Sequence, residues 1–191
     1  MDIRFLVPAI GIALGAAPIA SAETYGLEKT HGDLLFAISH AGFTEKHGTF
    51  RDFDATLQYD PEHVDKSQVT VTVKTGSIDT GLAQRDNDLK GTQFLDVAKY
   101  PDMAFASTRV VPGPAGTLVI EGELTLHGTT RPLTLNARLN KSAPNPFDKK
   151  PTLGFSATGL LKRSDYGITT FVPIIGDDVT ITIDVEFNRH P

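Results

Sequence analysis

The strongest constraint on the fold is an alternation of apolar and polar residues with a period of two, which recurs in eight separate segments. In the last segment, Val179, Ile181 and Ile183 alternate with Thr180 and Thr182. A strand with this pattern has one apolar and one polar face. This is typical of antiparallel sheets, because strands of parallel sheets are usually buried on both sides. The eight segments are 33–40, 49–60, 68–74, 102–111, 117–128, 132–140, 152–162 and 178–188.

Eight such strands can close into a barrel, which leaves no sheet edge exposed. Two sheets packed face to face give the same alternation, so the pattern alone leaves a barrel and a sandwich open. His127-Gly128-Thr129-Thr130 is predicted to be a tight hairpin turn, and the proline-rich segment 141–151 an exposed loop. The sequence therefore predicts an all-β fold.

The alternation stops within residues 85–101, where charged residues gather before Tyr100-Pro101. Leu82 and Leu89 are seven positions apart, and Arg85 and Asp86 lie between them. This spacing predicts one short helix between the third and fourth strands, with one or both charged residues on the side of the leucines. The helix either lies across one end of a barrel or is a solvated surface helix.

Residues 1–22 are predicted to be a cleaved secretory signal peptide, because the apolar run 5–20 is followed by small residues at 20–22. A retained membrane anchor is the alternative, but the run is short and is interrupted by Pro8 and Pro18. The chain would then be periplasmic.

Residues 23–191 are long enough for one domain with a sizeable core, which no disulfide can support because the chain has no Cys. The net charge of −5 is mild and there is no basic cluster. This argues against nucleic acid as a partner and against electrostatic docking onto anionic lipid.

Catalytic and metal-ligating residues are predicted to be absent. No G-x-S-x-G turn is present, and the six His are not spaced as in H-x-x-x-H. His40 and His47 could meet across a hairpin, so a metal-binding barrel remains an alternative, although His40 is expected to be buried and hydrogen-bonded. The apolar strand faces either line a container for an elongated amphiphile or fill a packed core, and the residues alone leave both open.

Several motifs in order resemble the YceI-like family of secreted lipid-binding proteins. They are the segment "SIDTGLAQRDNDLKGTQFLDVAKYPDMAFAS", and the motifs "GTFRDFDATLQYD", "GELTLHGTTRPLTL", "RSDYGI" and "IIGDDVTITIDVEF". The family pattern often has a His shortly after the Arg-Asp pair, where this chain has Asn87-Asp88. The chain has no Trp and so lacks the Gly-x-Trp of true lipocalins.

The resemblance implies a lipocalin-like, eight-stranded antiparallel barrel that holds a polyisoprenoid, an isoprenoid quinone or a fatty amide. The expected ligand-binding residues come from the apolar faces and the helical block: Phe36, Ile38, His40, Phe53, Leu57, Phe94, Met103, Phe105, Leu118, Ile120, Leu124, Phe155 and Leu161. At the barrel mouth, Arg85 and Asp86 are expected to pair with Arg163 and Asp165. Such a cluster would fix the helix or face a ligand headgroup.

The function expected from this resemblance is a periplasmic binding protein that sequesters or transports a long-chain isoprenoid, either a polyprenyl lipid or an isoprenoid quinone, or a related amphiphile. No cofactor, nucleic acid or stable membrane insertion is expected, and a homodimer is left open. The alternatives are a stress-related scaffold, a metal-binding barrel without lipid carriage, and an enzyme that modifies lipid headgroups.

Overall fold

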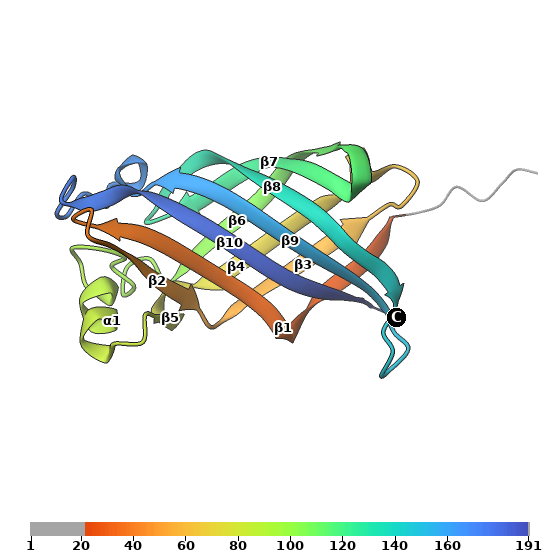
Figure 1. Ribbon diagram of the computed structural model, residues 1–191, viewed down its shortest axis with the longest axis horizontal. Helices are drawn as coiled ribbons and strands as arrows, with labels where there is room; N and C mark the ends of the chain where they lie inside the picture. Colours follow the sequence, from red (N-terminus) through yellow and green to blue (C-terminus); the bar gives the residue numbers. More distant parts are fainter. Residues whose placement is uncertain (1–21, 191) are drawn as a thin grey trace, which may run out of the picture.

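The computed structural model describes residues 22–190, which fold as a closed antiparallel β-barrel (Figure 1). Neighbouring strands around the ring are β1, β3, β4, β6, β7, β8, β9 and β10, and β10 pairs with β1 to close it. The strands are β1 (Glu23–His40), β2 (Thr44–Phe50), β3 (Phe53–Tyr59), β4 (Gln68–Lys74), β5 (Ile78–Asp79), β6 (Asp102–Pro112), β7 (Thr117–Leu126), β8 (Thr129–Pro144), β9 (Pro151–Lys162) and β10 (Ile175–Arg189). The predicted eight-stranded barrel is confirmed, and the closure excludes a sandwich.

Along one of its edges, strand β1 pairs with two different strands. Residues 23–26 pair with β3, and residues 35–40 pair with β2, which in turn pairs with the two-residue β5. The segment predicted as one strand, 49–60, therefore contains the end of β2 and all of β3, with a break at Arg51-Asp52. The first half of β1 was not expected, because Gly26, Gly32 and a polar run between them hide its alternation.

The predicted hairpin between β7 and β8 is confirmed. His127 and Gly128 connect the two strands, with φ angles of 51° and 73°. Two consecutive positive φ angles are typical of the type I′ turn, whose twist matches that of the flanking strands. The predicted exposed loop is shorter than expected, because β8 runs to Pro144 and β9 begins at Pro151.

The predicted helix is α1 (Ala83–Lys90), which lies at one end of the barrel, beside β5 (Figure 1). Arg85 and Leu89 are half-buried, but Leu82 is 53% exposed. Leu82 precedes the first helical turn with an extended backbone, so the helical spacing that placed it beside Leu89 does not apply. Within residues 22–190 the remaining helical elements are short 3-10 turns: η1 (Val64–Lys66), η2 (Thr75–Ser77), η3 (Pro114–Gly116) and η4 (Arg163–Tyr166).

The barrel end far from α1, here called the closed end, is filled with side chains. Tyr25, Leu57, Tyr59, Leu153 and Phe187 form one buried cluster there. The rings of Tyr25 and Tyr59 meet edge to face, with centroids 6.4 Å apart. Leu153 is only 1% exposed, which makes it one of the most deeply buried side chains of the described residues.

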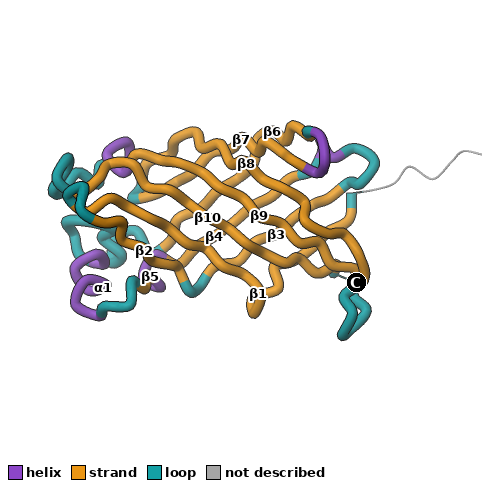
Figure 2. Tube along the Cα trace, viewed as in Figure 1, coloured by secondary structure: helices purple, strands orange, loops and turns teal. Residues whose placement is uncertain are grey.

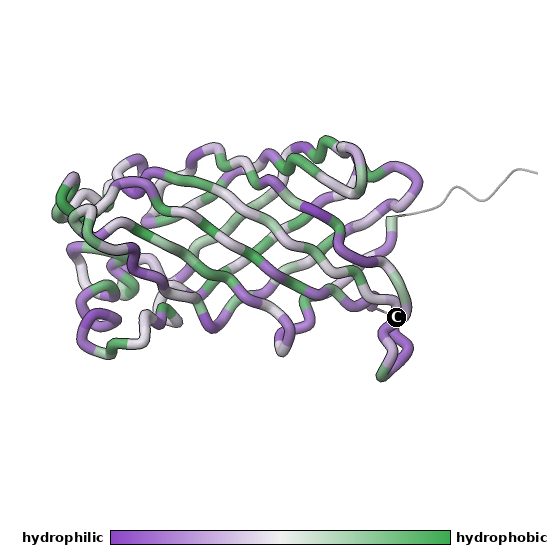
Figure 3. The backbone as a smooth tube through the Cα atoms, viewed as in Figure 1, coloured by the Kyte–Doolittle hydropathy of each residue, from purple (hydrophilic) through white to green (hydrophobic). Residues whose placement is uncertain are grey.

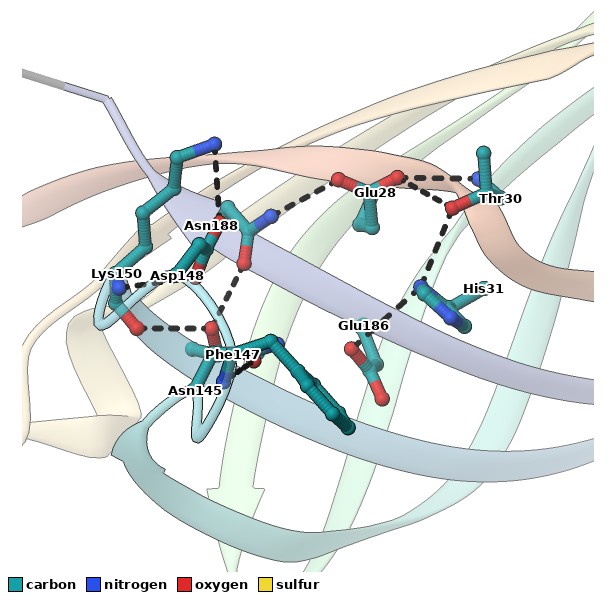
Figure 4. Close-up of polar contacts among 10 residues, drawn as sticks. Glu28, Thr30, His31, Asn145, Phe147, Asp148, Lys150, Glu186 and Asn188 are labelled. Atoms are coloured by element: carbon teal, nitrogen blue, oxygen red, sulfur yellow. Dashed lines mark hydrogen bonds and ion pairs between the residues drawn. The ribbon is translucent and has the colours of Figure 1, made fainter.

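Polar contacts fasten the closed end on its outside (Figure 4). Asn188 donates from Nδ2 to Glu28 Oε2 at 3.0 Å and accepts at Oδ1 from the Thr152 hydroxyl at 2.8 Å. These contacts join β1, β9 and β10 at the closed end. The closed end is therefore held by apolar burial inside and by hydrogen bonds outside.

The signal peptide predicted for residues 1–22 lies almost entirely outside the described residues. In the part of the chain that the structure describes, no helix is both long and apolar enough to span a bilayer.

Candidate functional site

The half of the barrel next to α1, here called the open half, contains a cavity of about 930 Å³. Its wall is built from the inward faces of β1, β4 and β6 to β10, together with β2 and the segment 91–95 that follows α1. Most of the side chains in this wall are aliphatic or aromatic. The same barrel is thus hollow at one end and solid at the other.

The structure brings many of the predicted ligand-binding residues together in this cavity wall. They come from four strands and from the segment after α1: Phe36, Ile38, His40, Phe94, Met103, Phe105, Leu124 and Leu161. Each of these residues is therefore placed where its side chain can contact a ligand in the cavity.

The other predicted ligand-binding residues do not line the cavity. Leu57 and Phe155 belong to the closed-end cluster. Leu118 and Ile120 pack near Val110, in a small third cluster. The remaining residue of this set is the buried Phe53. The alternation correctly predicts that these strands have an apolar face, but it carries no information on the height of a residue along the barrel axis.

His40 lies differently from the expectation. It is the last residue of β1, and it is exposed at the edge of the cavity rather than buried. His47 pairs with Ala37 across the β1–β2 hairpin and is likewise exposed.

Several cavity residues were not among the predicted ones. Val179, Ile181 and Ile183 of β10, and Leu133 and Leu135 of β8, lie on strand faces that alternation had already marked as apolar. Ile168, Phe171 and Leu95 come from loops, where no periodic signal exists.

Two glycines allow aromatic rings to lie against the cavity wall. Phe36 pairs with Gly48 across β1 and β2, and a Cβ atom at Gly48 would lie 2.3 Å from Phe36 Cζ. A Cβ atom at Gly122 would lie 2.4 Å from Phe105 Cζ in the same way. Real Cβ atoms do not approach so closely, so each ring depends on the missing side chain of its glycine for its position.

Arg85 and Asp86 hold α1 to the chain that precedes it. Both charged groups contact Thr80: Arg85 donates to its hydroxyl oxygen at 2.8 Å and to its carbonyl at 2.7 Å. The Thr80 backbone N–H donates to Asp86 Oδ1 at 2.8 Å, and the Thr80 hydroxyl donates to the same oxygen. The threonine hydroxyl thus links the guanidinium to the carboxylate.

Arg163 forms a second, separate anchor at the same end. Its side chain is 6% exposed and donates to three backbone carbonyls, those of Gly176 at 2.8 Å, Ile168 at 3.1 Å and Ile175 at 3.1 Å. Burial lowers the pKa of the Arg163 guanidinium, although nearby Asp177 opposes this effect. Arg163 therefore ties together the two ends of the loop between η4 and β10.

The predicted pairing of Arg85 and Asp86 with Arg163 and Asp165 is wrong. The ion pairs among the described residues include none between these four side chains, and Asp165 is exposed. The carboxylate beside the second anchor is Asp177, which accepts from the Ser164 backbone at 2.9 Å and from its hydroxyl at 2.7 Å. These bonds from Ser164 lower the pKa of Asp177. Proximity in sequence favoured Asp165, but the return of β10 brings Asp177 closer.

The polar groups of the cavity lie towards the α1 end. Besides Arg85 and Arg163, the wall contains Lys46 and Gln93. Lys46 is the cross-strand partner of Ile38 and so faces the same side of the sheet. In residues 22–190 no three His, Asp or Glu side chains come together as a metal site requires. The arrangement therefore offers burial for an apolar chain, with hydrogen-bond donors near its outer end.

Comparison with known proteins gives consistent matches across nearly the whole barrel. Residues 25–187 match the family described as the YceI-like domain. Protein YceI of Salmonella arizonae is 39% identical over 169 residues, which is 87% of this chain and 87% of that protein.

Solved structures of similar proteins have the same fold. The YCEI protein of Campylobacter jejuni is 30% identical, with a TM-score of 0.72 over 81% of this chain and 91% of that chain. A polyisoprenoid binding domain from Saccharophagus degradans is 16% identical, with a TM-score of 0.65 over 87% of this chain and 98% of that domain. At this lower identity the likeness concerns the fold.

Proposed function

This chain belongs to the YceI-like family, and we propose that it sequesters or transports a long-chain isoprenoid, or a related amphiphile, in the cavity of its open half. The cargo would be a polyprenyl lipid or an isoprenoid quinone. We further propose that residues 1–22 direct the chain to the periplasm, where such a cargo needs a carrier. Each methylene group kept from water is worth about 0.8 kcal/mol, so a long chain does not cross water readily by itself.

The observation that carries this proposal is the cavity of about 930 Å³ with an apolar wall. This volume lies at the upper end of the range for ligand pockets, and apolar walls with a few polar groups are typical of them. If one chain carbon fills roughly the volume of one water molecule, about 30 Å³, the cavity holds about 30 carbons, or about six isoprene units. A longer chain would have to protrude, because the closed end is packed.

The polar groups of the wall favour a particular orientation of the cargo. Lys46, Arg85 and Gln93 lie with α1 at the outer end, whereas the inner end borders the packed cluster of Tyr25 and Leu153. A polar headgroup loses less hydration at the outer end than it would against that cluster. The cargo would therefore enter tail first and keep its headgroup at the mouth.

The solved domain from Saccharophagus degradans is described as polyisoprenoid binding, which supports the same ligand class for this fold. Catalysis plays no part in the proposal, since the residues that line the cavity supply mainly apolar surface.

Native mass spectrometry of the gently purified protein, followed by lipid extraction, tests the proposal. We expect a co-purifying isoprenoid or related amphiphile. Retinol, a fluorescent isoprenoid alcohol, serves as a probe in solution. Leu161→Trp places bulk in the cavity wall, and Leu160→Trp places the same bulk on the outer face of β9, where Leu160 is 60% exposed.

Leu161→Trp should weaken retinol binding, and Leu160→Trp should leave it unchanged. A protein that contains no lipid and fails to bind retinol would contradict the proposal. Equal retinol binding by the two variants would place the ligand elsewhere.

A further inference from the structure

Large apolar side chains are exposed around the mouth of the cavity. Phe43 is 87% exposed in the turn between β1 and β2, and Phe171 and Ile174 are 60% and 68% exposed in the loop 167–174. The turn and the loop are neighbours, because the Ala41 backbone N–H donates to the Ile174 carbonyl at 2.9 Å. Phe43, Phe171 and Ile174 are here called the apolar rim.

The turn between β1 and β2 and the loop before β10 lie at the same end of the barrel as α1 (Figure 1 and Figure 2). The loop 167–174 forms part of the strongly hydrophobic tip at that end (Figure 3). Residues 167–176 contain no charged side chain, although 21% of the whole chain is charged. A long uncharged loop that exposes several large apolar side chains is typical of an interaction surface.

Ordered contacts hold the rim residues in their exposed positions. The Thr170 hydroxyl donates to the Gln93 carbonyl at 2.7 Å, and the Ile175 N–H donates to the Phe171 carbonyl at 2.8 Å. Phe171 has a φ angle of 63°, a region that bulky residues rarely occupy. Such strain persists only where the surrounding structure imposes it, and it gathers at functional positions.

The rim is continuous with the cavity. The ring of Phe171 packs against that of Phe94 with centroids 6.3 Å apart, and both residues contribute to the cavity wall. An apolar chain that left the cavity past Phe94 would therefore meet Phe171 before it met water. The residues that line the cavity and the residues that face outward thus form one apolar path.

From these observations we propose that the apolar rim docks on the surface of a lipid bilayer and lets a tail pass between the membrane and the cavity. The inference rests on the proposed function, because the path has a purpose only for an apolar cargo. A second copy of this chain seated on the rim would instead block the path. Since the net charge is −5, we expect docking on neutral headgroups by apolar insertion rather than by attraction to anionic lipid.

Flotation with vesicles of pure phosphatidylcholine tests the inference, with protein expressed from the full chain and processed by the cell. The double variant Phe43→Ser/Ile174→Ser removes two side chains of the apolar rim that are not part of the cavity wall. The control is Phe147→Ser, because Phe147 is 93% exposed in the loop at the closed end (Figure 4). All proteins share the same amino terminus, so any contribution from it is common to them.

We expect the wild type and Phe147→Ser to float with the vesicles. The double variant should bind at least about tenfold more weakly, since burial of even one large apolar side chain is worth roughly that factor. Transfer of retinol from the vesicles should slow by a similar factor. Uptake of retinol added from ethanol should be unchanged. Added salt and added phosphatidylglycerol should have little effect on flotation.

Several results would overturn the docking inference while the proposed function stands. They are normal uptake of retinol from ethanol together with absent flotation, equal flotation of all three proteins, or flotation that requires phosphatidylglycerol and disappears in salt. Light scattering that finds a wild-type dimer and a monomeric double variant, without flotation, would assign the rim to self-association. Failure of the wild type to take up retinol from ethanol, together with no co-purifying lipid, would instead contradict the proposed function itself.

Discussion

The open half and the closed end of the barrel are built from the same strands, with the same alternation, yet one is hollow and the other solid. Leu161 and Leu153 illustrate the contrast, because both lie on β9 and share one face of that strand. Leu153 is 1% exposed in the closed-end cluster, whereas Leu161 lines the cavity. An inward-facing residue either packs or lines a cavity. Which of the two it does depends on the side chains of the opposite wall at the same level along the barrel axis.

Large side chains fill the closed end, whereas in the open half two aromatic rings lie against the wall instead of crossing the barrel. Tyr25, Tyr59 and Phe187 reach across the closed end. In the open half, glycines at 48 and 122 let two phenylalanine rings lie against the wall. Both ends contribute buried clusters to the core, since Phe105, Leu124 and Leu135 are buried in the open half, and the open half encloses the cavity as well.

The largest expected effect compares Leu153→Ala with Leu161→Ala. Leu153→Ala should destabilise the fold by about 4 kcal/mol, because it opens a void in a packed cluster. Leu161→Ala should cost only about 1 kcal/mol, because its side chain already borders empty space and loses mainly transfer free energy. Urea denaturation measures both. Equal losses would mean that the open half is packed as tightly as the closed end.

The next effect compares the two arginine anchors of the open half. Arg163→Ala leaves one buried and two partly buried carbonyls without their donor and should cost about 3 kcal/mol. Arg85→Ala should cost only about 1 kcal/mol, because Asp86 keeps both of its bonds from Thr80. Urea denaturation of each variant checks the difference, and a larger loss for Arg85→Ala would restore the pairing that the sequence suggested.

A smaller effect is expected from adding a side chain at a glycine, and it compares Gly48 in the open half with Gly154 at the closed end. A Val side chain at Gly48 must displace the ring of Phe36, and the cavity is the space open to that ring. Gly48→Val should therefore weaken retinol binding about tenfold, which is about 1.4 kcal/mol.

Gly154→Val is the matched control, since nothing lies within 4 Å of a Cβ atom there. Fluorescence titration measures both variants. Unchanged affinity in Gly48→Val would remove Phe36 from the site.

The smallest expected effect is a loosening of the mouth in acid. The bonds from Ser164 lower the pKa of Asp177 in the folded state. A depressed pKa contributes stability that is present above the unfolded value, about 3.9 for Asp, and is lost as the pH falls through the folded value. The protection factors of the amides of residues 163–168, which correct for the intrinsic pH dependence of exchange, should therefore fall in acid while those of the closed end stay high.

Asp177→Asn should show the loosening at neutral pH and should abolish its pH dependence. If the protection factors of residues 163–168 change with pH in the same way as those of the closed end, Asp177 does not anchor the mouth.

The sequence predicts the barrel well because facing is a local property. Leu57 and Phe105 both alternate correctly, and the turn at His127-Gly128 follows from two residues. Whether the interior is filled or hollow is not a local property. Leu57 packs in a cluster and Phe105 borders the cavity because of the residues that distant strands place beside them.

The mouth was harder to predict for the same reason. Arg163 bonds to backbone carbonyls of a returning loop, for which no residue type is diagnostic. The sequence favoured charge pairs between Arg85 and Asp165, but the side chains of the folded mouth are satisfied by Thr80 and by the backbone.

The most direct test of the account is photo-crosslinking with a diazirine-labelled isoprenoid alcohol, followed by identification of the labelled peptides. We expect labels at residues of the open half, such as Phe94, Met103 and Leu161, and we expect unlabelled isoprenoid to suppress them. Labels concentrated around Tyr25 and Leu153, or labelling that unlabelled isoprenoid does not suppress, would contradict a cavity that holds an apolar tail.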